Sequence, residues 1–413
     1  MQRAMTKLIL IVCTMLSLGQ CAFFLNEDSH DPLIRQTEDG LPVFYIHTAP
    51  GSVEYCPGIL YYRGREYQIE GKIRGASSRY YPMKSYTIKF CEDQLFSDPE
   101  FGFDNERKIV LITSFNDNSF IRNRLGFDIW NSMDNGHIRI KTYSAVVYLN
   151  GKYWGLYTVS EHINAFLMAE HGLSSDGNLY KTRSPAADFF IKEDLHRGFE
   201  KTEGYPEDGD AGAYADLDEL VTFISTAEPD VFTNTIDSIL NKREYEAWWM
   251  FVMLLRASDS CAKNAFHYHK PGSSVWRYIP WDLNSSFGQN SKTKREGSDV
   301  LNNYFGLNNI FKRFHEEDDI RNPLQTRFYT LLSPENELDI NRILSKIDEY
   351  TLEIREAALK SEEKWKDKYR DYVLWKERTD FTTFDEEIQY IKDWITNRHL
   401  LLINAYSRYI RSR

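Results

Sequence analysis

Residues 256–288 read RASDSCAKNAFHYHKPGSSVWRYIPWDLNSSFG and are the most informative part of this 413-residue chain. A strongly apolar stretch before them predicts a helix that ends just ahead of Asp259, and Asn264 lies in the loop that follows. Two short strands with a Pro-Gly-Ser-Ser turn between them then lead to Asp282. A helix end, a polar loop and a strand pair therefore supply three oxygen-bearing side chains within one short segment.

The residue types at these positions suit phosphoryl transfer. That reaction needs a carboxylate to orient the acceptor hydroxyl and oxygen ligands for magnesium. Asp259, Asn264 and Asp282 offer such a set, and protein kinases place the first two at the same separation. The spacing alone is a weak signal, because a capped turn and a strand end would also account for the two aspartates.

Composition limits the classes of protein to consider. The apolar fraction of 42% and the aromatic fraction of 15% are enough to bury a large core. A chain of this length forms roughly two or three domains or one two-lobed catalytic unit. The formal charge of −11 and the pI near 5.5 predict no nucleic-acid partner, because nucleic-acid binding requires a basic face.

The N-terminus has the pattern of a secretory signal peptide. Arg3 and Lys7 precede an apolar run at residues 8–18, and small residues follow it. This order predicts a cleaved signal peptide at residues 1–22, with lipid modification of Cys21 as the alternative. The apolar run is too short to span a bilayer comfortably, and no later segment is apolar enough. The mature chain is therefore expected to be secreted or on the cell surface, without a transmembrane helix.

Residue patterns predict a β-rich first part and a helical second part. Residues 36–161 contain short runs of Tyr, Ile and Val, and the Asn-Gly pair at 150–151 is a strong hairpin signal. Residues 244–257 are so apolar that we expect a central core helix. Residues 198–218 are rich in acids and glycine, which indicates an exposed loop.

Cysteines and histidines give weaker signals. Cys56, Cys91 and Cys261 remain after cleavage, and one disulfide between the first two would suit an oxidising compartment. His267 and His269 point to the same face of a predicted strand, as two metal ligands would. With no third ligand nearby, hydrogen-bonded or surface histidines are favoured.

Four stretches resemble the spore-coat protein H (CotH) kinase family, an atypical branch of the protein-kinase-like fold. They are IRGASSRYYPMKSYTIKF at 73–90, NDNSFIRNRLGFDIW at 116–130, VVYLNGKYWGLYTVSEHI at 146–163, and the block at 256–288. Their order and spacing are similar to the family. The resemblance implies an α+β, two-lobed fold with a mainly β small lobe at 36–161 and a mainly helical large lobe at 162–413.

The resemblance also assigns roles to residues. Asp259 matches the catalytic-loop aspartate, while Asn264 and Asp282 match the ligands of Mg²⁺. Lys84, in PMKSY, matches a lysine that binds the phosphates of ATP. Where family members often read WDLD, this chain has Asn284, and an amide there would weaken the metal site.

The IRGASS stretch resembles a phosphate-binding loop. Gly75 would let backbone amides approach a phosphate, and Ser77 and Ser78 could donate hydrogen bonds to it. Arg74 is included in the same predicted cofactor site.

Three further charged residues have more than one interpretation. Glu161 is predicted to contact the cofactor, either by pairing with Lys84 or by facing the adenine, but it could equally cap a helix that begins at Asn164. Arg122 and Arg124 could reach phosphates, but salt bridges explain them at least as well.

The resemblance implies a secreted protein Ser/Thr kinase. With ATP and Mg²⁺, it would transfer the γ-phosphoryl group to a coat or surface protein. Two alternatives remain: a non-catalytic surface adhesin of the same family, which Asn284 favours, and a kinase-like fold that transfers AMP.

Overall fold

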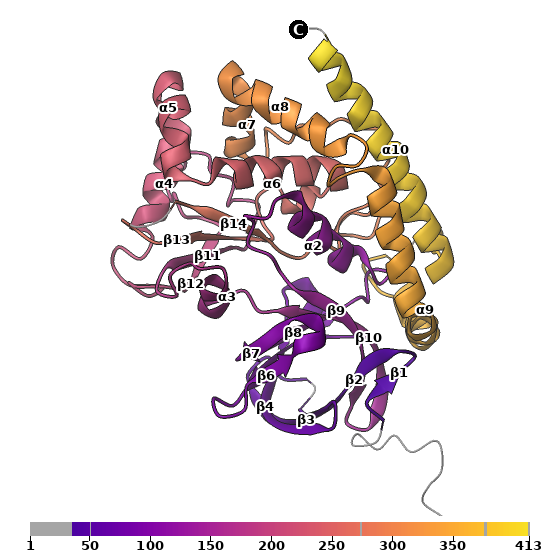
Figure 1. Ribbon diagram of the computed structural model, residues 1–413. Coiled ribbons are helices and arrows are strands. Elements are labelled where there is room, and N and C mark those ends of the chain that lie inside the picture. Colours follow the sequence, from indigo (N-terminus) through magenta and orange to yellow (C-terminus); the bar gives the residue numbers. More distant parts are fainter. Residues whose placement is uncertain (1–34, 50, 273–274, 376–377, 412–413) are drawn as a thin grey trace, which may run out of the picture.

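Figure 1 shows a computed structural model of the chain, which describes residues 35–49, 51–272, 275–375 and 378–411. The predicted signal peptide at 1–22 lies outside the described residues. The fold is mixed α+β, with a curved sheet at the bottom of Figure 1 and most helices above it. Among the described residues, no helix is long and apolar enough to cross a membrane.

The N-terminal part is a strongly curved eight-stranded sheet in the order β1-β2-β3-β4-β5-β8-β10-β9. Its strands are β1 (Thr37–Glu38), β2 (Leu41–Thr48), β3 (Cys56–Tyr62), β4 (Arg65–Arg74), β5 (Ser85–Phe90), β8 (Lys108–Thr113), β9 (Thr142–Leu149) and β10 (Lys152–Glu161). β2 also pairs in parallel with β9, so the sheet closes into a barrel. A small sheet of β6 (Phe96–Asp98) and β7 (Phe103–Glu106) and the 3₁₀ helices η1 (Ser77–Tyr80) and η2 (Pro99–Phe101) accompany the barrel.

The predicted hairpin at 150–151 is confirmed, because it joins β9 to β10. Asn150 has φ +50° and Gly151 has φ +76°, as a tight two-residue turn requires. Alternation along β9 also explains the packing. Val147 faces the barrel core whereas Val146 belongs to the core shared with the helices, since successive side chains of a strand point to opposite faces.

The second part holds the helices and a four-stranded sheet in the order β12-β11-β13-β14. Its strands are β11 (Asn178–Thr182), β12 (Phe199–Glu203), β13 (Ala265–His269) and β14 (Arg277–Pro280). Its helices are α2 (Arg122–Met133), α3 (Ala165–Glu170), α4 (Ala215–Thr226), α5 (Pro229–Ile239), α6 (Lys242–Leu255), η3 (Ser258–Ser260), α7 (Asn309–Glu316), α8 (Asp318–Leu332), α9 (Ile340–Arg370) and α10 (Phe384–Arg411). We call this part the helical region.

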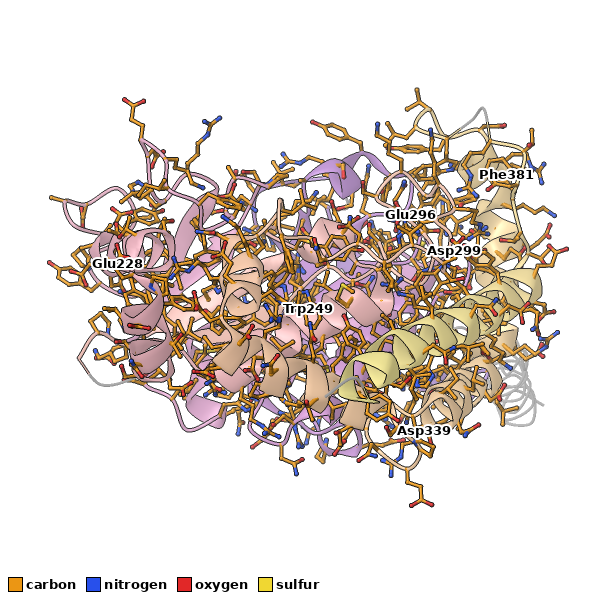
Figure 2. All side chains as sticks on the ribbon, turned by 90° about the horizontal axis from the view of Figure 1, so that it is seen from above. Glu228, Trp249, Glu296, Asp299, Asp339 and Phe381 are labelled. Atoms are coloured by element: carbon orange, nitrogen blue, oxygen red, sulfur yellow. The ribbon has the colours of Figure 1, made fainter. Side chains whose placement is uncertain are left out.

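Helix α6 is the predicted central core helix. Every residue from Glu244 to Leu255 is buried, and Trp249 lies in the middle of the molecule when it is seen from above (Figure 2). The prediction of a loop at residues 198–218 is wrong in part, because they contain β12. Pairing with β11 makes a strand of a segment whose own composition favours a loop.

The barrel core is not closed by the N-terminal residues alone. Trp365, Tyr369 and Trp375, from α9 and the segment after it, pack into the barrel cluster. The division into lobes at 36–161 and 162–413 stays a prediction, because the C-terminal part contributes to both cores.

The three described cysteines are unpaired, so the disulfide considered between Cys56 and Cys91 is not formed. Cys56 lies on β3 opposite Gly71 of β4, whereas Cys91 directly follows β5 on the other side of β4. Strands two places apart in a sheet are about 9–10 Å apart, which is beyond the reach of a disulfide.

Candidate active site

Asp259 lies on a short turn that follows the buried helix α6. Arg256 ends this helix in the left-handed region, with φ +51°, and η3 then carries Asp259. Asn264 Nδ2 donates to Asp259 Oδ2 at 2.9 Å, and Lys263 Nζ lies 2.7 Å from Asp259 Oδ1. Both carboxylate oxygens are therefore held in place, and the predicted proximity of Asp259 and Asn264 is found in the structure.

Asp282 is brought to this loop by the β13–β14 pair. Ala265 is opposite Pro280, and the Trp281 amide donates to the Asn264 carbonyl at 2.9 Å. Asn264 and Asp282 have left-handed φ values of +59° and +58°, a conformation that clusters at functional sites in non-glycine residues. Burial raises the pKa of Asp282, and the negative charge of Asp259 raises it further.

The oxygen atoms around Asp282 fit a hard divalent cation. Asn264 uses its Nδ2 on Asp259, which leaves its amide oxygen available. The Asp282 carboxylate forms no hydrogen bond or ion pair with the residues described. A carboxylate and an amide oxygen are ligands that Mg²⁺ accepts. Asn264 and Asp282 could therefore hold the metal that the sequence predicts, with Asp259 beside them.

Basic side chains from both parts of the molecule face Asp282. Arg74, at the end of β4, lies over the Trp281 ring at 4.8 Å. Burial lowers the pKa of Arg74 to about 10, and the Asp282 charge opposes this shift. Lys181, on β11, has a pKa lowered to about 8 by burial and by the charge of Arg74. These cations are suited to phosphate oxygens.

Sequence reasoning identified Arg74 but missed Lys181 and His162. His162 follows β10, and its pKa is lowered to about 3 by burial and then by the charges of Arg74 and Lys108. Its Nδ1 is buried and has no hydrogen-bond partner among the described residues. The SEHI motif contained His162, and a closer look at its polar residues could have found it. Nothing in the local sequence around Lys181 indicates a site.

The predicted phosphate loop forms the turn from β4 to η1. Gly75 has φ +104°, and a Cβ atom there would collide with Ser78 Oγ, so the turn requires glycine. Ser77 and Ser78 begin η1. Lys84 lies beyond it, and its Nζ donates to the Arg79 carbonyl at 2.7 Å. The Lys84 ammonium therefore supports the turn and is not paired with either aspartate.

Glu161 is the last residue of β10, and its partner is Lys141. Its Oε2 accepts from the Lys141 amide at 2.6 Å, and its Oε1 lies 2.8 Å from Lys141 Nζ. The expected pairing with Lys84 is therefore wrong. The helix-cap interpretation is also wrong, because the Asn164 side chain accepts from the Leu167 amide of α3. Contact of Glu161 with adenine stays a prediction.

Arg122 and Arg124 form salt bridges, the second interpretation given to them. Arg122 is fully buried and lies 2.6 Å from Asp117 and 2.5 Å from Glu387. Arg124 lies 2.7 Å from Glu353. Both arginines therefore join α2 to the C-terminal helices.

The two candidate histidine ligands have protein partners. His267 Nδ1 is 2.9 Å from the Tyr245 hydroxyl, and His269 Nδ1 is 2.7 Å from Asp216. The hydrogen-bonded interpretation is confirmed for both.

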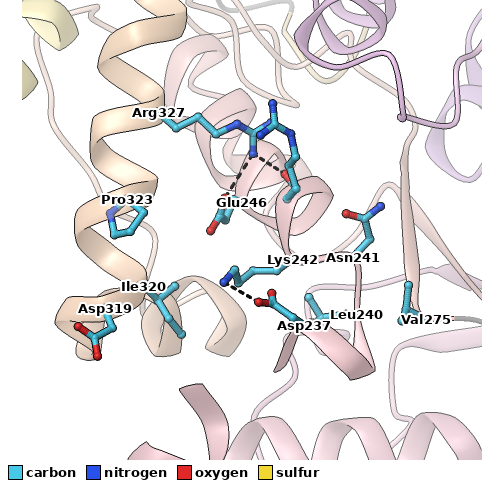
Figure 3. A pocket seen from close by; sticks show the side chains of 11 residues that line it. Asp237, Leu240, Asn241, Lys242, Glu246, Val275, Asp319, Ile320, Pro323 and Arg327 are labelled. Carbon is cyan, nitrogen blue, oxygen red and sulfur yellow. Dashed lines mark hydrogen bonds and ion pairs between the residues drawn. The ribbon is translucent and has the colours of Figure 1, made fainter. Parts of the chain in front are cut away.

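A separate cavity of about 580 Å³ lies at the other end of α6 (Figure 3). Four of its charged side chains are paired with one another. Lys242 lies 3.0 Å from Asp237, and Arg327 lies 3.3 Å from Glu246. Since α6 rises about 1.5 Å per residue, this cavity is remote from Asp259, which follows the C-terminal end of the helix.

The loop with Asp259 and Asn264, the half-buried Asp282 and the nearby cations together define a candidate phosphoryl-transfer site. A family model described as CotH kinase protein matches residues 72–402. The chain is 23% identical over 383 residues to the inner spore coat protein H of Bacillus subtilis (strain 168). The alignment covers 88% of this chain and 97% of that protein. The chain belongs to the CotH kinase protein family, and the predicted resemblance is confirmed.

A solved structure was also matched. The crystal structure of the Helicobacter pylori proinflammatory kinase CtkA covers 90% of this chain and 98% of that one. The sequence identity is 12% and the TM-score is 0.33.

Proposed function

We propose that this chain is a two-lobed protein kinase that transfers the γ-phosphoryl group of ATP to Ser or Thr residues of a coat or surface protein. The observation that carries the proposal is the convergence of Asp259, Asn264 and Asp282 beside Arg74. Membership of the CotH kinase family supports the same chemistry. The printed name of the Bacillus relative, an inner spore coat protein, supports a coat or surface location.

In this mechanism the β barrel forms the small lobe and the helical region forms the large one. Asp259 orients the acceptor hydroxyl, while Asn264 and Asp282 hold Mg²⁺. The cation, when bound, neutralises charge on the phosphates. Catalysis then depends on positioning and on charge neutralisation.

The phosphates of ATP contact a group of residues from both lobes. On the small lobe these are the Gly75 turn, with Ser77, Ser78 and Lys84, and the neighbouring Arg74. On the large lobe Lys181 lies close enough to Arg74 for the Arg74 charge to lower the pKa of Lys181. Because burial disfavours both cations in the absence of an anion, a polyphosphate would be a favourable partner.

Asn284 follows Asp282 by two residues and takes the place of the second family aspartate. It is half-buried, and its Oδ1 accepts from Ser285 Oγ at 3.3 Å. We infer that it weakens Mg²⁺ binding without removing an oxygen ligand from this position.

The test is incubation of the purified protein with Mg²⁺ and γ-labelled ATP, with casein as a general Ser/Thr acceptor and with autophosphorylation scored in parallel. Asp259→Ala and Asp282→Ala should abolish label transfer. Asp299→Ala, at an exposed aspartate outside the site (Figure 2), is the matched control and should keep it.

Other outcomes identify the alternatives. Label transfer from α-labelled ATP that is lost in the same two variants would indicate transfer of AMP. If the protein binds no nucleotide but still binds to cell surfaces, the kinase function is excluded in favour of a surface adhesin.

A further inference from the structure

Three glutamates meet where the barrel ends and the chain continues into the helical region. Glu106 is the last residue of β7, Glu161 the last of β10 and Glu170 the last of α3. One carboxylate oxygen of each lies within 4.8 Å of the others. The group therefore joins β7 to the consecutive elements β10 and α3.

Two of these carboxylates are buried. Glu106 is 2% exposed and Glu161 is 0% exposed, whereas Glu170 reaches solvent. Glu106 Oε1 has no hydrogen-bond partner within the part of the chain that the structure describes. Burying a carboxylate oxygen without a partner is costly. A cation or a hydrogen-bond donor from outside the described chain could therefore bind to Glu106 Oε1.

Lys141 brings an ammonium group to the cluster, but it does not complete it. Its Nζ lies 2.8 Å from Glu161 Oε1 and 3.3 Å from Glu170 Oε1. No ion pair joins it to Glu106 among the described residues. Three carboxylates face one ammonium, and Asp104, exposed on the same strand as Glu106, adds further negative potential.

The Lys141 ammonium can be displaced. Its side chain is 36% exposed, so the flexible stem can carry the charge into solvent while the backbone stays in place. The Lys141 amide would remain bonded to Glu161 Oε2 at 2.6 Å. An incoming cation would thus find Glu161 already oriented.

The ligand types select the class of cation. The group consists of glutamates, and carboxylate oxygens favour Ca²⁺, Mg²⁺ and Mn²⁺ over the softer transition metals. Ca²⁺ accepts about 6–8 oxygens in a flexible geometry. Three carboxylates on three separate elements, with water entering beside exposed Glu170, suit that geometry better than the strict octahedron of Mg²⁺.

We propose that Glu106, Glu161 and Glu170 form a Ca²⁺ site in which the cation takes the place of the Lys141 ammonium. The bound ion ties residues 161–170 to β7. It thereby stiffens the connection between the barrel and the helical region. The site is separate from Asp259 and Asp282 and does not depend on kinase activity.

The test uses the full chain, freed of metal with a chelator and titrated with CaCl₂ by isothermal titration calorimetry. The Asp282→Asn variant empties the proposed catalytic metal site and should keep Ca²⁺ binding. Glu106→Gln and Glu170→Gln should each weaken it at least about tenfold. Asp104→Asn, on the same strand, is the matched control and should stay within about twofold of the parent. Because Glu170 is exposed, its variant is expected to fold even if Glu106→Gln does not.

A variant that is expected to strengthen Ca²⁺ binding distinguishes a cation site from a salt-bridge network. Lys141→Gln removes the competing ammonium and should tighten Ca²⁺ binding several-fold, with a larger rise of Tm on adding CaCl₂. A Glu170→Gln variant that binds Ca²⁺ as the parent does would overturn the proposal. So would loss of all Ca²⁺ binding in Asp282→Asn, or a Lys141→Gln variant that loses Tm and gains no response to CaCl₂.

Discussion

Two groups of charges lie next to Asp282 and the residues that follow it, one of them mostly buried and the other half-buried, and they differ in how completely they are paired. Arg122 and Arg295 share Glu387, and Arg122 also contacts Asp117. In this first group, cations and carboxylates are equal in number and joined by short ion pairs. The group also holds the loop after Asp282, because Arg122 Nε donates to the Ser286 carbonyl at 3.1 Å.

The second group surrounds Asp282 and is incompletely paired. Asp282 makes no ion pair with any residue described. Arg74 and Lys181 lie near it, although burial lowers the pKa of each and so disfavours their charged forms. A balanced group serves the architecture, because each charge already has its partner. An unbalanced one is suited to a ligand, because the missing partners can come from outside. The predictions below test this difference, beginning with the largest expected effect.

Asp259→Asn should reduce label transfer by about 10²–10⁴-fold, since the acceptor hydroxyl loses its orienting carboxylate. The free energy of unfolding should change by less than about 1 kcal/mol, because the Lys263 pair is partly exposed. Initial rates of transfer and urea denaturation measure the two effects. A variant that loses stability and activity in parallel would show that Asp259 belongs to the architecture.

Glu387→Gln should show the reverse pattern. It leaves Arg122 buried with one carboxylate fewer, and removal of one partner of a buried ion pair costs about 3–5 kcal/mol. Urea denaturation measures this loss. The control is Asp385→Asn, at a residue on the same helix as Glu387. It breaks an exposed pair with Arg355 of α9 and should cost at most about 1 kcal/mol. Equal losses in the two variants would contradict the balanced-group interpretation.

The contribution of Glu387 should depend on pH. Burial acts to raise its pKa, but Arg122 and Arg295 lower it from 4.5 to about 2. Because the folded state holds the ionised form, this stabilisation is present above pH 4.5 and is lost as the pH falls towards 2. The difference in unfolding free energy between the parent and Glu387→Gln should be constant at neutral pH and shrink over that window. A difference independent of pH would exclude an ionised Glu387 as its source.

Lys181→Met and Arg74→Met should each raise the Kd for ATP about 10- to 100-fold, because a charge-assisted contact contributes roughly 1.5–3 kcal/mol. Stability should be unchanged or higher, since each variant removes a half-buried cation that forms no ion pair with a described residue. Lys152→Met, at an exposed lysine of the barrel, is the control for loss of positive charge. If ATP binding is unchanged in both site variants, Arg74 and Lys181 do not contact the phosphates of ATP.

Asn284→Asp should have the smallest effect. A carboxylate in place of the amide should lower the Mg²⁺ concentration required for half-maximal transfer by a few-fold. If the added charge instead raises that concentration, the residue does not face the metal, and its place in the family pattern has another cause.

Local sequence was sufficient for several features. The Asn150-Gly151 turn and the buried helix α6 were predicted because turn chemistry and apolar periodicity act over a few residues. The Asp259–Asn264 contact was also within reach, because both residues lie on one short loop. The strands β11 and β12 could not be predicted from local sequence, because their pairing partners and not their own composition make them strands.

The roles of the charged residues depended on contacts between distant segments. Glu161 was expected beside Lys84, yet it pairs with Lys141 across the end of the barrel. Arg122 and Glu387 lie 265 residues apart, so no local pattern could show that they neutralise each other. Sequence specifies which chemical groups a chain has and how neighbours are spaced. Which of them are paired, and which are left for a ligand, depends on burial and distance, and these arise only when the whole chain has folded.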